Sequence, residues 1–359
     1  MDTTDTRIPV TLLTGFLGAG KTTLLNHLIN DPEAGRIAVI MNEFGAAGLD
    51  HDLIEASTEE TILMQSGCLC CTFRGDISKT LGSLMASKDR GELDFERIVI
   101  ETTGIADPAP ILHTLVMDDL SAPYFRMDGV VTLADAAAGP ATLDAHSEAV
   151  SQIAMADRIV VTKTDLVSED DVAAFEMRLA DLNSRAKTII ADHGAVPVGS
   201  LFGISAMRED VSAEDIAAWI GTSRAPQDAA DGKSPQARHD QRITSASIEI
   251  EAPISANAFD FWLDMLLAFN GPNILRMKGI VHVDDIPWPF VFHGVQHIFD
   301  APVPLKNWAG SDKNTRVVVI ARNMDKEELK ESLNMLLMQP KEVVVAANDL
   351  IPEAAEMPF

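Results

Sequence analysis

The stretch Gly15-Phe16-Leu17-Gly18-Ala19-Gly20-Lys21-Thr22 decides the fold of this chain. It matches the pattern G-x-x-x-x-G-K-[ST], whose glycines let the backbone wrap closely around phosphate groups. A short apolar run at 10–13 precedes it, and apolar residues recur at helical spacing over 22–29. A strand, a glycine-rich turn and a helix in this order bring phosphate to the N-terminus of the helix. The stretch therefore predicts a phosphate-binding loop.

Four more apolar runs resemble buried strands, and segments with helical periodicity separate most of them. Alternation of this kind predicts an α/β P-loop NTPase fold, in which helices cover both faces of a mostly parallel sheet. The predicted strands lie at 36–41, 97–100, 129–133 and 158–162.

A polar segment rich in Pro, Gly, Ser and Asp divides the chain. We expect a nucleotide-binding domain at 1–222, a linker at 223–243 and a smaller α+β domain at 244–359. His293 and His297 are four residues apart in a predicted strand, and we expect both to face solvent. The remaining predicted elements of the second domain are strands at 247–250, 280–283, 290–299 and 316–320 and helices at 255–268 and 325–336.

The composition excludes some classes of partner. The 359 residues carry a formal charge of −26, which disfavours binding to nucleic acid and to anionic membranes. No apolar run approaches the ~18 residues of a membrane span, and the first residues lack the features of a signal peptide. We therefore expect a cytoplasmic protein with no nucleic-acid or membrane partner.

Three residues are the candidate catalytic groups. Lys21 is placed to neutralise the β- and γ-phosphates, and the Thr22 hydroxyl to ligate Mg²⁺. Glu101 ends an apolar strand where a P-loop protein needs a carboxylate near the metal. Its extra methylene, compared with the usual aspartate, leaves open whether it contacts Mg²⁺ directly or through a water. Asp107 and Asp135 also follow strand ends, and we expect each of them either to cap a helix or to contact Mg²⁺.

Thr162-Lys163-Thr164-Asp165 stands where guanine-reading proteins carry N-K-x-D. An aspartate there accepts hydrogen bonds from a donor pair that adenine lacks, so ATP would leave it unpaired. Because Thr162 replaces the asparagine, we expect the bracing of the loop by that amide to be lost. The sequence predicts GTP, with nucleotide contacts at Gly15, Gly18, Ala19, Gly20, Lys21, Thr22, Thr23, Thr162, Lys163, Asp165, Ser205 and Ala206, the last two placed like the segment that meets the guanine carbonyl.

All three cysteines of the chain, Cys68, Cys70 and Cys71, lie within four positions. Thiolates suit Zn²⁺, and three of them leave a fourth tetrahedral position open. In an extended chain Cys71 points away from the other two, so binding of one ion by all three requires a turn. The alternatives are small buried side chains or a redox sensor.

Together with Asn42-Glu43-Phe44-Gly45 and Glu101-Thr102-Thr103-Gly104, the segment Gly67-Cys68-Leu69-Cys70-Cys71 resembles the CobW-like family of P-loop GTPases. That family includes zinc metallochaperones, cobalamin-biosynthesis proteins and nitrile hydratase activators. Residues 276–279 and 293–295 resemble its C-terminal domain. The resemblance departs at Ala46, where many members have a glutamate.

The resemblance implies a GTPase that binds Zn²⁺, or alternatively Co²⁺, through the C-x-C-C motif. Its partners would be GTP and GDP, the metal ion, and a client metalloprotein or cofactor-insertion machinery. Two alternatives remain: a GTP-dependent regulatory switch with a structural zinc that recruits a partner through the C-terminal domain, and a P-loop kinase or ligase that uses ATP.

Overall fold

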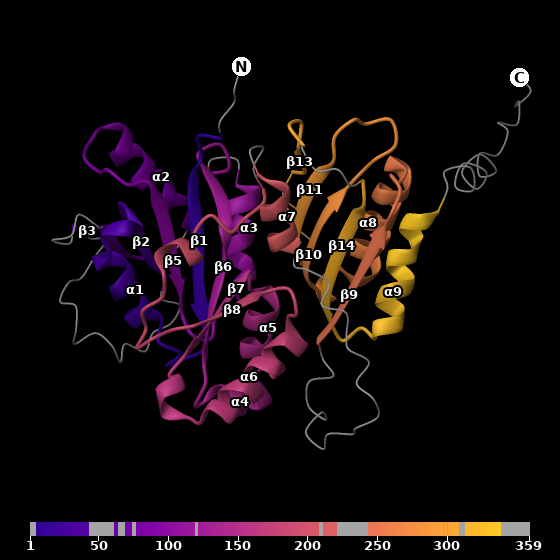
Figure 1. Ribbon diagram of the computed structural model, residues 1–359. Coiled ribbons are helices and arrows are strands. Elements are labelled where there is room, and N and C mark those ends of the chain that lie inside the picture. The colour runs from indigo at the N-terminus through magenta and orange to yellow at the C-terminus, as the bar shows by residue number, and fades with distance from the viewer. Residues whose placement is uncertain are drawn as a thin grey trace, which may run out of the picture.

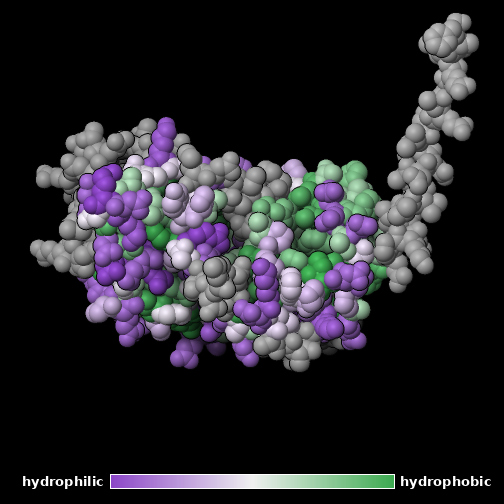
Figure 2. All heavy atoms as spheres, turned by 90° about the horizontal axis from the view of Figure 1, so that it is seen from above, coloured by the Kyte–Doolittle hydropathy of each residue, from purple (hydrophilic) through white to green (hydrophobic). Residues whose placement is uncertain are grey.

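The computed structural model describes residues 5–42, 61–63, 69–73, 77–118, 121–207, 211–220, 243–296, 298–299, 301–308 and 313–338. Two sheets lie side by side, one from the N-terminal and one from the C-terminal part of the chain, with helices between them (Figure 1). The N-terminal part presents mostly hydrophilic residues from above, whereas hydrophobic residues gather on the C-terminal part (Figure 2). In the described ranges, no helix combines the length and apolar character of a membrane span.

The larger sheet has eight strands in the order β3-β4-β2-β5-β1-β6-β7-β8. Neighbouring strands are parallel except β3 and β4, which are antiparallel, so the expected mostly parallel sheet is confirmed. The strands are Ile8–Gly15 (β1), Ile37–Asn42 (β2), Thr61–Leu63 (β3), Leu69–Phe73 (β4), Arg97–Thr102 (β5), Phe125–Asp135 (β6), Arg158–Thr162 (β7) and Lys187–Ile190 (β8).

Helices cover both faces of this sheet because alternate strand residues bury apolar side chains on opposite sides. Val10 and Leu12 of β1 pack towards α2, α3 and α5, whereas Leu13 packs towards α1. Helix α6 begins with a capping box between Ser168 and Asp171. The helices are Lys21–Asn30 (α1), Ile77–Asp89 (α2), Ala109–Met117 (α3), Gly139–Ala145 (α4), Ser147–Met155 (α5), Glu169–Leu182 (α6) and Ala213–Ile220 (α7).

The second sheet is antiparallel, in the order β12-β11-β10-β14-β9, with β13 paired to β11. Helices α8 and α9 cover one face around Trp262, which is fully buried. The opposite face packs against α3, α5 and α7. The elements are Ile243–Ile250 (β9), Ala256–Asn270 (α8), Ile274–Val281 (β10), Phe290–Val295 (β11), Ile298–Phe299 (β12), Val303–Pro304 (β13), Thr315–Arg322 (β14) and Lys326–Asn334 (α9).

Three expectations for this part need correction. The strand predicted at 280–283 is β10, which begins at Ile274 and ends at Val281. The strand predicted at 290–299 is a hairpin of β11 and β12. His293 does not face solvent: its exposed fraction is 6%, because α7 covers that face and Trp219 packs edge-on against the imidazole. His297 and residues 223–242 of the predicted linker lie outside the described residues, and Ile243, the last residue of that prediction, begins β9.

A buried cluster of charges joins the two parts of the chain. The Asp157 carboxylate, just before β7, lies 2.5 Å from Arg276 Nη2 and 2.6 Å from Lys278 Nζ on β10. Burial alone would raise the pKa of Asp157, but Arg276 and Lys278 hold it far below its usual value. Burial, together with repulsion from Arg276, lowers the pKa of Lys278 to about 8 despite the attraction of Asp157. Two cations therefore share one carboxylate.

We expect Asp157→Asn to lower the free energy of unfolding by about 3–5 kcal/mol, because it leaves two buried cations without a counter-charge. Denaturant unfolding monitored by tryptophan fluorescence measures this change. Asp144→Asn, which breaks a more exposed pair with Arg178, is the control and should leave stability nearly unchanged. A loss with Asp157→Asn as small as that of the control would contradict the prediction.

The lowered pKa of Lys278 gives a prediction for alkaline pH. Between about pH 8 and the ordinary lysine value of about 10.4, the unfolded chain holds a proton on Lys278 that the folded chain has released. Stability rises with pH wherever the unfolded state binds more protons. We expect the wild type to gain stability relative to Lys278→Met from pH 8 to pH 10, as measured by urea unfolding at each pH. A constant difference would refute the assignment.

Candidate phosphate and metal site

The loop between β1 and α1 has the geometry of a phosphate cradle. Gly15 has φ +141°, and a Cβ there would lie 2.6 Å from the Leu133 carbonyl oxygen, so only glycine fits this close approach. The Lys21 ammonium folds back and donates to the carbonyls of Gly15, at 2.7 Å, and Phe16, at 3.2 Å. Burial lowers the pKa of Lys21, and the nearby Glu101 carboxylate acts in the opposite direction. The cation is thus held at the mouth of the loop.

Thr22 and Glu101 meet at the ends of neighbouring elements. Leu13 of β1 pairs with Glu101 of β5, so the carboxylate lies beside the first turn of α1. The Thr22 hydroxyl donates to Glu101 Oε1 at 3.3 Å. A hydroxyl and a carboxylate at this distance are oxygen ligands of the kind Mg²⁺ takes. The structure therefore brings the three candidate catalytic groups, Lys21, Thr22 and Glu101, together.

The turn after β5 presses against the phosphate loop. The amide of Ala106 donates to the Thr103 carbonyl at 3.1 Å, which closes the turn. A Cβ on Gly104 would lie 2.5 Å from the Leu17 backbone nitrogen, so no larger residue fits without displacing the loop. Asp107 accepts a hydrogen bond from the amide of Ala109, the first residue of α3, although the N-cap position itself is Pro108.

Thr162 braces the phosphate loop through its hydroxyl, in place of the asparagine amide that this position lacks. Its hydroxyl donates to the Ala19 carbonyl at 2.8 Å, because β7 ends directly beside the loop. Lys163, with φ 56°, lies 2.7 Å from the Asp135 carboxylate, which also accepts from the amides of Ala137 and Ala138. Asp165 lies in a 3₁₀ turn, Thr164–Leu166, and is exposed. Lys163 and Asp165 therefore follow β7 at the edge of the sheet that carries the loop.

Ser205 and Ala206 do not join this site. Gly203, two residues earlier, donates its amide to Asp128 at 2.8 Å, and Asp128 lies near the opposite end of β6 from the phosphate loop. Ala206 belongs to the apolar cluster beneath the C-terminal sheet. The expected guanine contact at these residues is thus wrong, because the chain crosses to the other edge of the sheet after β8.

The loop that directly follows β8 lies beside the phosphate loop instead. A Cβ on Gly194 would lie 2.7 Å from Thr23 Cγ2, on α1. Sequence reasoning missed this loop because no motif marks it, although its position after a parallel strand is a signal.

The cysteine motif is described only in part. Cys70 and Cys71 belong to β4, which runs parallel to β2, and β2 runs parallel to β5. Ile40 of β2 pairs with Cys71 on one side and with Ile100, the residue before Glu101, on the other. Strands lie about 4.8 Å apart, so the Cys71 backbone is roughly 10 Å from that of Ile100. Cys68 and the side chains of Cys70 and Cys71 lie outside the described residues.

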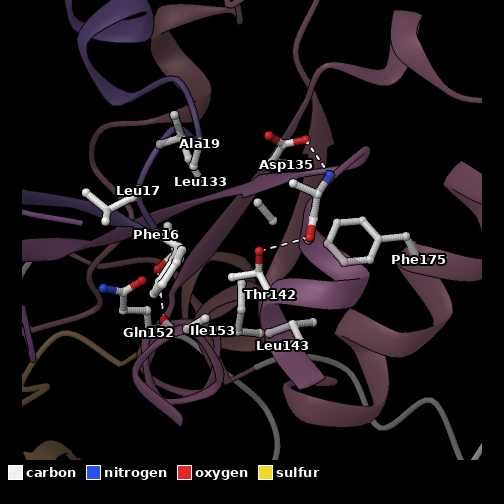
Figure 3. Close-up of a pocket in the computed structure, with 15 residues that line it drawn as sticks. Phe16, Leu17, Ala19, Leu133, Asp135, Thr142, Leu143, Gln152, Ile153 and Phe175 are labelled. Atoms are coloured by element: carbon white, nitrogen blue, oxygen red, sulfur yellow. Dashed lines mark hydrogen bonds between the residues drawn. The ribbon is translucent and has the colours of Figure 1, made fainter. Parts of the chain in front are cut away.

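A small pocket, partly open to solvent, adjoins the tip of the phosphate loop. Phe16, Leu17 and Gln152 lie on one side of it and Phe175 on the other (Figure 3). Phe16 also stacks on His146, with ring centroids 4.5 Å apart. Among the described residues, no group of three or more His, Cys, Asp or Glu side chains is arranged to hold a metal ion.

Sequence reasoning missed one residue and one contact that connect these parts. Gln152 of α5 contacts the turn after β5, and Asp135, expected as a helix cap or a metal contact, forms an ion pair with Lys163. Gln152 carries a readable signal, because it is a polar residue among the buried positions of an amphipathic helix.

Known proteins share this architecture. The CobW/HypB/UreG nucleotide-binding domain matches residues 9–190, and the cobalamin synthesis protein cobW C-terminal domain matches residues 243–337. The zinc chaperone YjiA of Escherichia coli is 33% identical over 325 residues, which cover 90% of this chain and 96% of that protein. The zinc-regulated GTPase metalloprotein activator 1 of Schizosaccharomyces pombe is 29% identical over 354 residues, covering 90% and 84%.

The crystal structure of the Zn(II)-bound YjiA GTPase from E. coli aligns with a TM-score of 0.72 at 30% identity, covering 92% of this chain and 99% of that one. An alignment of this extent includes both domains. The chain therefore belongs to the CobW/HypB/UreG family of nucleotide-binding proteins, in the form that carries a CobW C-terminal domain.

Proposed function

We propose that this protein hydrolyses GTP to GDP and phosphate and couples the reaction to the binding and delivery of Zn²⁺. The observation that carries the proposal is the meeting of Lys21, Thr22 and Glu101 at adjoining strand ends, in a sheet that also carries the cysteine motif. Relatives named zinc chaperone and zinc-regulated GTPase metalloprotein activator support zinc as the cargo.

Lys21 neutralises the β- and γ-phosphates when it leaves the carbonyls of Gly15 and Phe16. The Thr22 hydroxyl and the Glu101 carboxylate would hold Mg²⁺, which would neutralise charge on the phosphates. The backbone of Gly15, Gly18, Ala19 and Gly20 and the first turn of α1, including Thr23, surround the phosphates. Catalysis in such sites is mostly positioning and charge stabilisation, which is why the fixed strand ends matter.

Guanine is the base that the loop after β7 fits. The Lys163 stem covers the ring, and the exposed Asp165 carboxylate accepts from the imino N–H and the exocyclic amine. ATP offers no such donor pair, which costs on the order of 1–3 kcal/mol. The backbone after β8, beside Thr23, takes the role that the sequence assigned to Ser205 and Ala206.

Cys68, Cys70 and Cys71 bind the transferable Zn²⁺ through thiolates, and a fourth position stays open for a client's ligand. The short path through β2 from Glu101 to Cys71 supports coupling between nucleotide state and metal affinity. The client is a metalloprotein or a cofactor-insertion system that accepts zinc.

The brace from Thr162 generates a prediction on affinity. Thr162→Val keeps the shape of the side chain but leaves the Ala19 carbonyl without its donor. We expect GTP affinity to fall by about tenfold, within the 1–3 kcal/mol cost of a buried unpaired acceptor. Thr162→Ser keeps the hydroxyl and is the matched control. Equal dissociation constants for GTP in the two variants, measured by calorimetry, would show that the brace does not matter.

The coupling is tested by nucleotide affinity with and without metal. We expect Zn²⁺ to change the ratio of GTP to GDP dissociation constants by about fivefold or more, since linkage makes the two affinities interdependent. The triple variant C68S/C70S/C71S should lose this change while still binding GTP. Lys21→Ala should bind Zn²⁺ but lose GTP affinity. Competition with ATP tests the choice of nucleotide, and competition with Co²⁺ tests the choice of metal. Identical ratios with and without Zn²⁺ would rule the coupling out.

A further inference from the structure

Gln152 is a polar side chain in a buried place. Its exposed fraction is 1%, and Ala149, Val150 and Ile153 on the same helix are buried apolar residues. Burying an amide costs free energy unless its polar atoms are hydrogen-bonded. The proposed hydrolysis mechanism does not use this residue, so its contacts need a separate explanation.

The amide of Gln152 holds the turn after β5. Its Nε2 donates to the Gly104 carbonyl at 3.2 Å and to the Ala106 carbonyl at 3.1 Å. Two acceptors on one side fix the orientation of the amide, because the reversed amide would set its oxygen against both carbonyls. The backbone of Gln152 is itself fixed to β6, since its carbonyl accepts from the Thr132 hydroxyl at 2.9 Å. The Gln152 side chain therefore ties the turn to α5, whose backbone is held to β6 at the same residue.

The held turn is the part of the chain that packs against the phosphate loop. Gly104 has no room for a Cβ beside Leu17, so any shift of one segment displaces the other. Figure 3 shows Gln152 on the same side of the pocket as Phe16 and Leu17. Gln152 therefore holds the turn that packs directly against the phosphate loop.

The C-terminal end of the same helix is held by the other domain. The Met155 carbonyl accepts from the guanidinium of Arg276, on β10. Asp157, two residues beyond the helix, binds both Arg276 and Lys278. Ala154 and Met155 also share an apolar cluster with Leu275 and residues of β11 and β14. Helix α5 thus contacts the turn after β5 through Gln152 and the C-terminal sheet through Met155. These two residues are only three positions apart on the helix.

We propose that Gln152 is a positioning residue that links the nucleotide state to the C-terminal domain through α5. The turn after β5 moves with the γ-phosphate, Gln152 transmits the movement to the helix, and Arg276 transmits it to β10. The inference rests on the proposed function, because it needs GTP bound at the phosphate loop. Coupling of this kind is a two-way relation, so the position of the C-terminal domain also affects the turn.

The test compares Gln152→Met with Ile153→Val in the full-length protein. Methionine keeps the length and burial of the side chain but donates no hydrogen bond, whereas Ile153→Val perturbs packing on the same helix without touching the turn. We expect Q152M to lower kcat for GTP hydrolysis by about tenfold or more, with KM for GTP within about twofold, because a misplaced turn affects the reaction more than binding. Ile153→Val should leave both constants near those of the wild type.

Hydrogen exchange supplies the readout for the domain link. In the wild type, a non-hydrolysable GTP analogue and GDP should give different exchange in peptides from β10, 274–281. In Q152M this difference should vanish while the analogue still binds. If Q152M keeps both the full difference and the wild-type kcat, the proposal is overturned. If the wild type binds no GTP analogue, the proposed function itself fails, and that result is distinct. Gln152→Asn, whose amide is too short to reach the turn, should behave as Q152M does and replaces it if methionine prevents folding.

Discussion

The carboxylate of Asp157 is the constraint on which the arrangement of the molecule depends. It lies directly before β7, accepts from the Val130 amide at 2.9 Å and binds two cations from the C-terminal sheet. A buried carboxylate between two cations is poorly stabilising in itself, because all three groups lose their hydration. It is highly specific, however, since any other docking of the two sheets would leave buried charge unpaired. Asp157 thereby fixes the position of the start of β7 relative to β10.

This constraint reaches the nucleotide site along one strand. Strand β7 has five residues, and its far end is Thr162, which donates to the phosphate loop. A strand of this length spans about 16 Å and does not stretch. The loop that carries Lys163 and Asp165 and the domain junction are consequently at the two ends of one rigid strand. Lys163 and Asp165 stand where they do because the strand before them is fixed at its other end.

Local patterns predicted the parts of the fold that depend on neighbours in sequence. The phosphate loop and the five strands around it are visible because each needs only a short apolar run and a glycine-rich turn. The prediction for Ser205 and Ala206 failed because a Ser-Ala pair carries no information on which edge of the sheet the chain has reached. The brace from Thr162 was missed because a hydroxyl can replace an amide donor only when the acceptor is close enough. The distance from Thr162 to the Ala19 carbonyl is set by the tertiary structure and not by the local sequence.

The C-terminal domain shows the same limit more strongly. Arg276 and Lys278 are two residues apart and therefore face the same side of β10, which is readable from the alternation of a strand. Their partner Asp157 is not readable, because it lies on a different domain far along the chain. His293 was expected in solvent for the same reason: its strand face is covered by α7, a helix that precedes the linker.

The carboxyl ends of β1, β5, β6 and β7 lie at one edge of the larger sheet, because these strands are parallel. From Glu101, one path leads outward through β2 to β4 and the cysteine motif, and it consists of backbone pairing alone. The other path leads from the turn after Glu101 through Gln152 and α5 to β10, and it depends on side chains. A backbone path transmits small shifts with little loss, whereas a side-chain path can be broken by one substitution. The two paths begin within a few residues of each other, so a displacement of the turn after β5 would reach the cysteine motif and the C-terminal domain by separate routes.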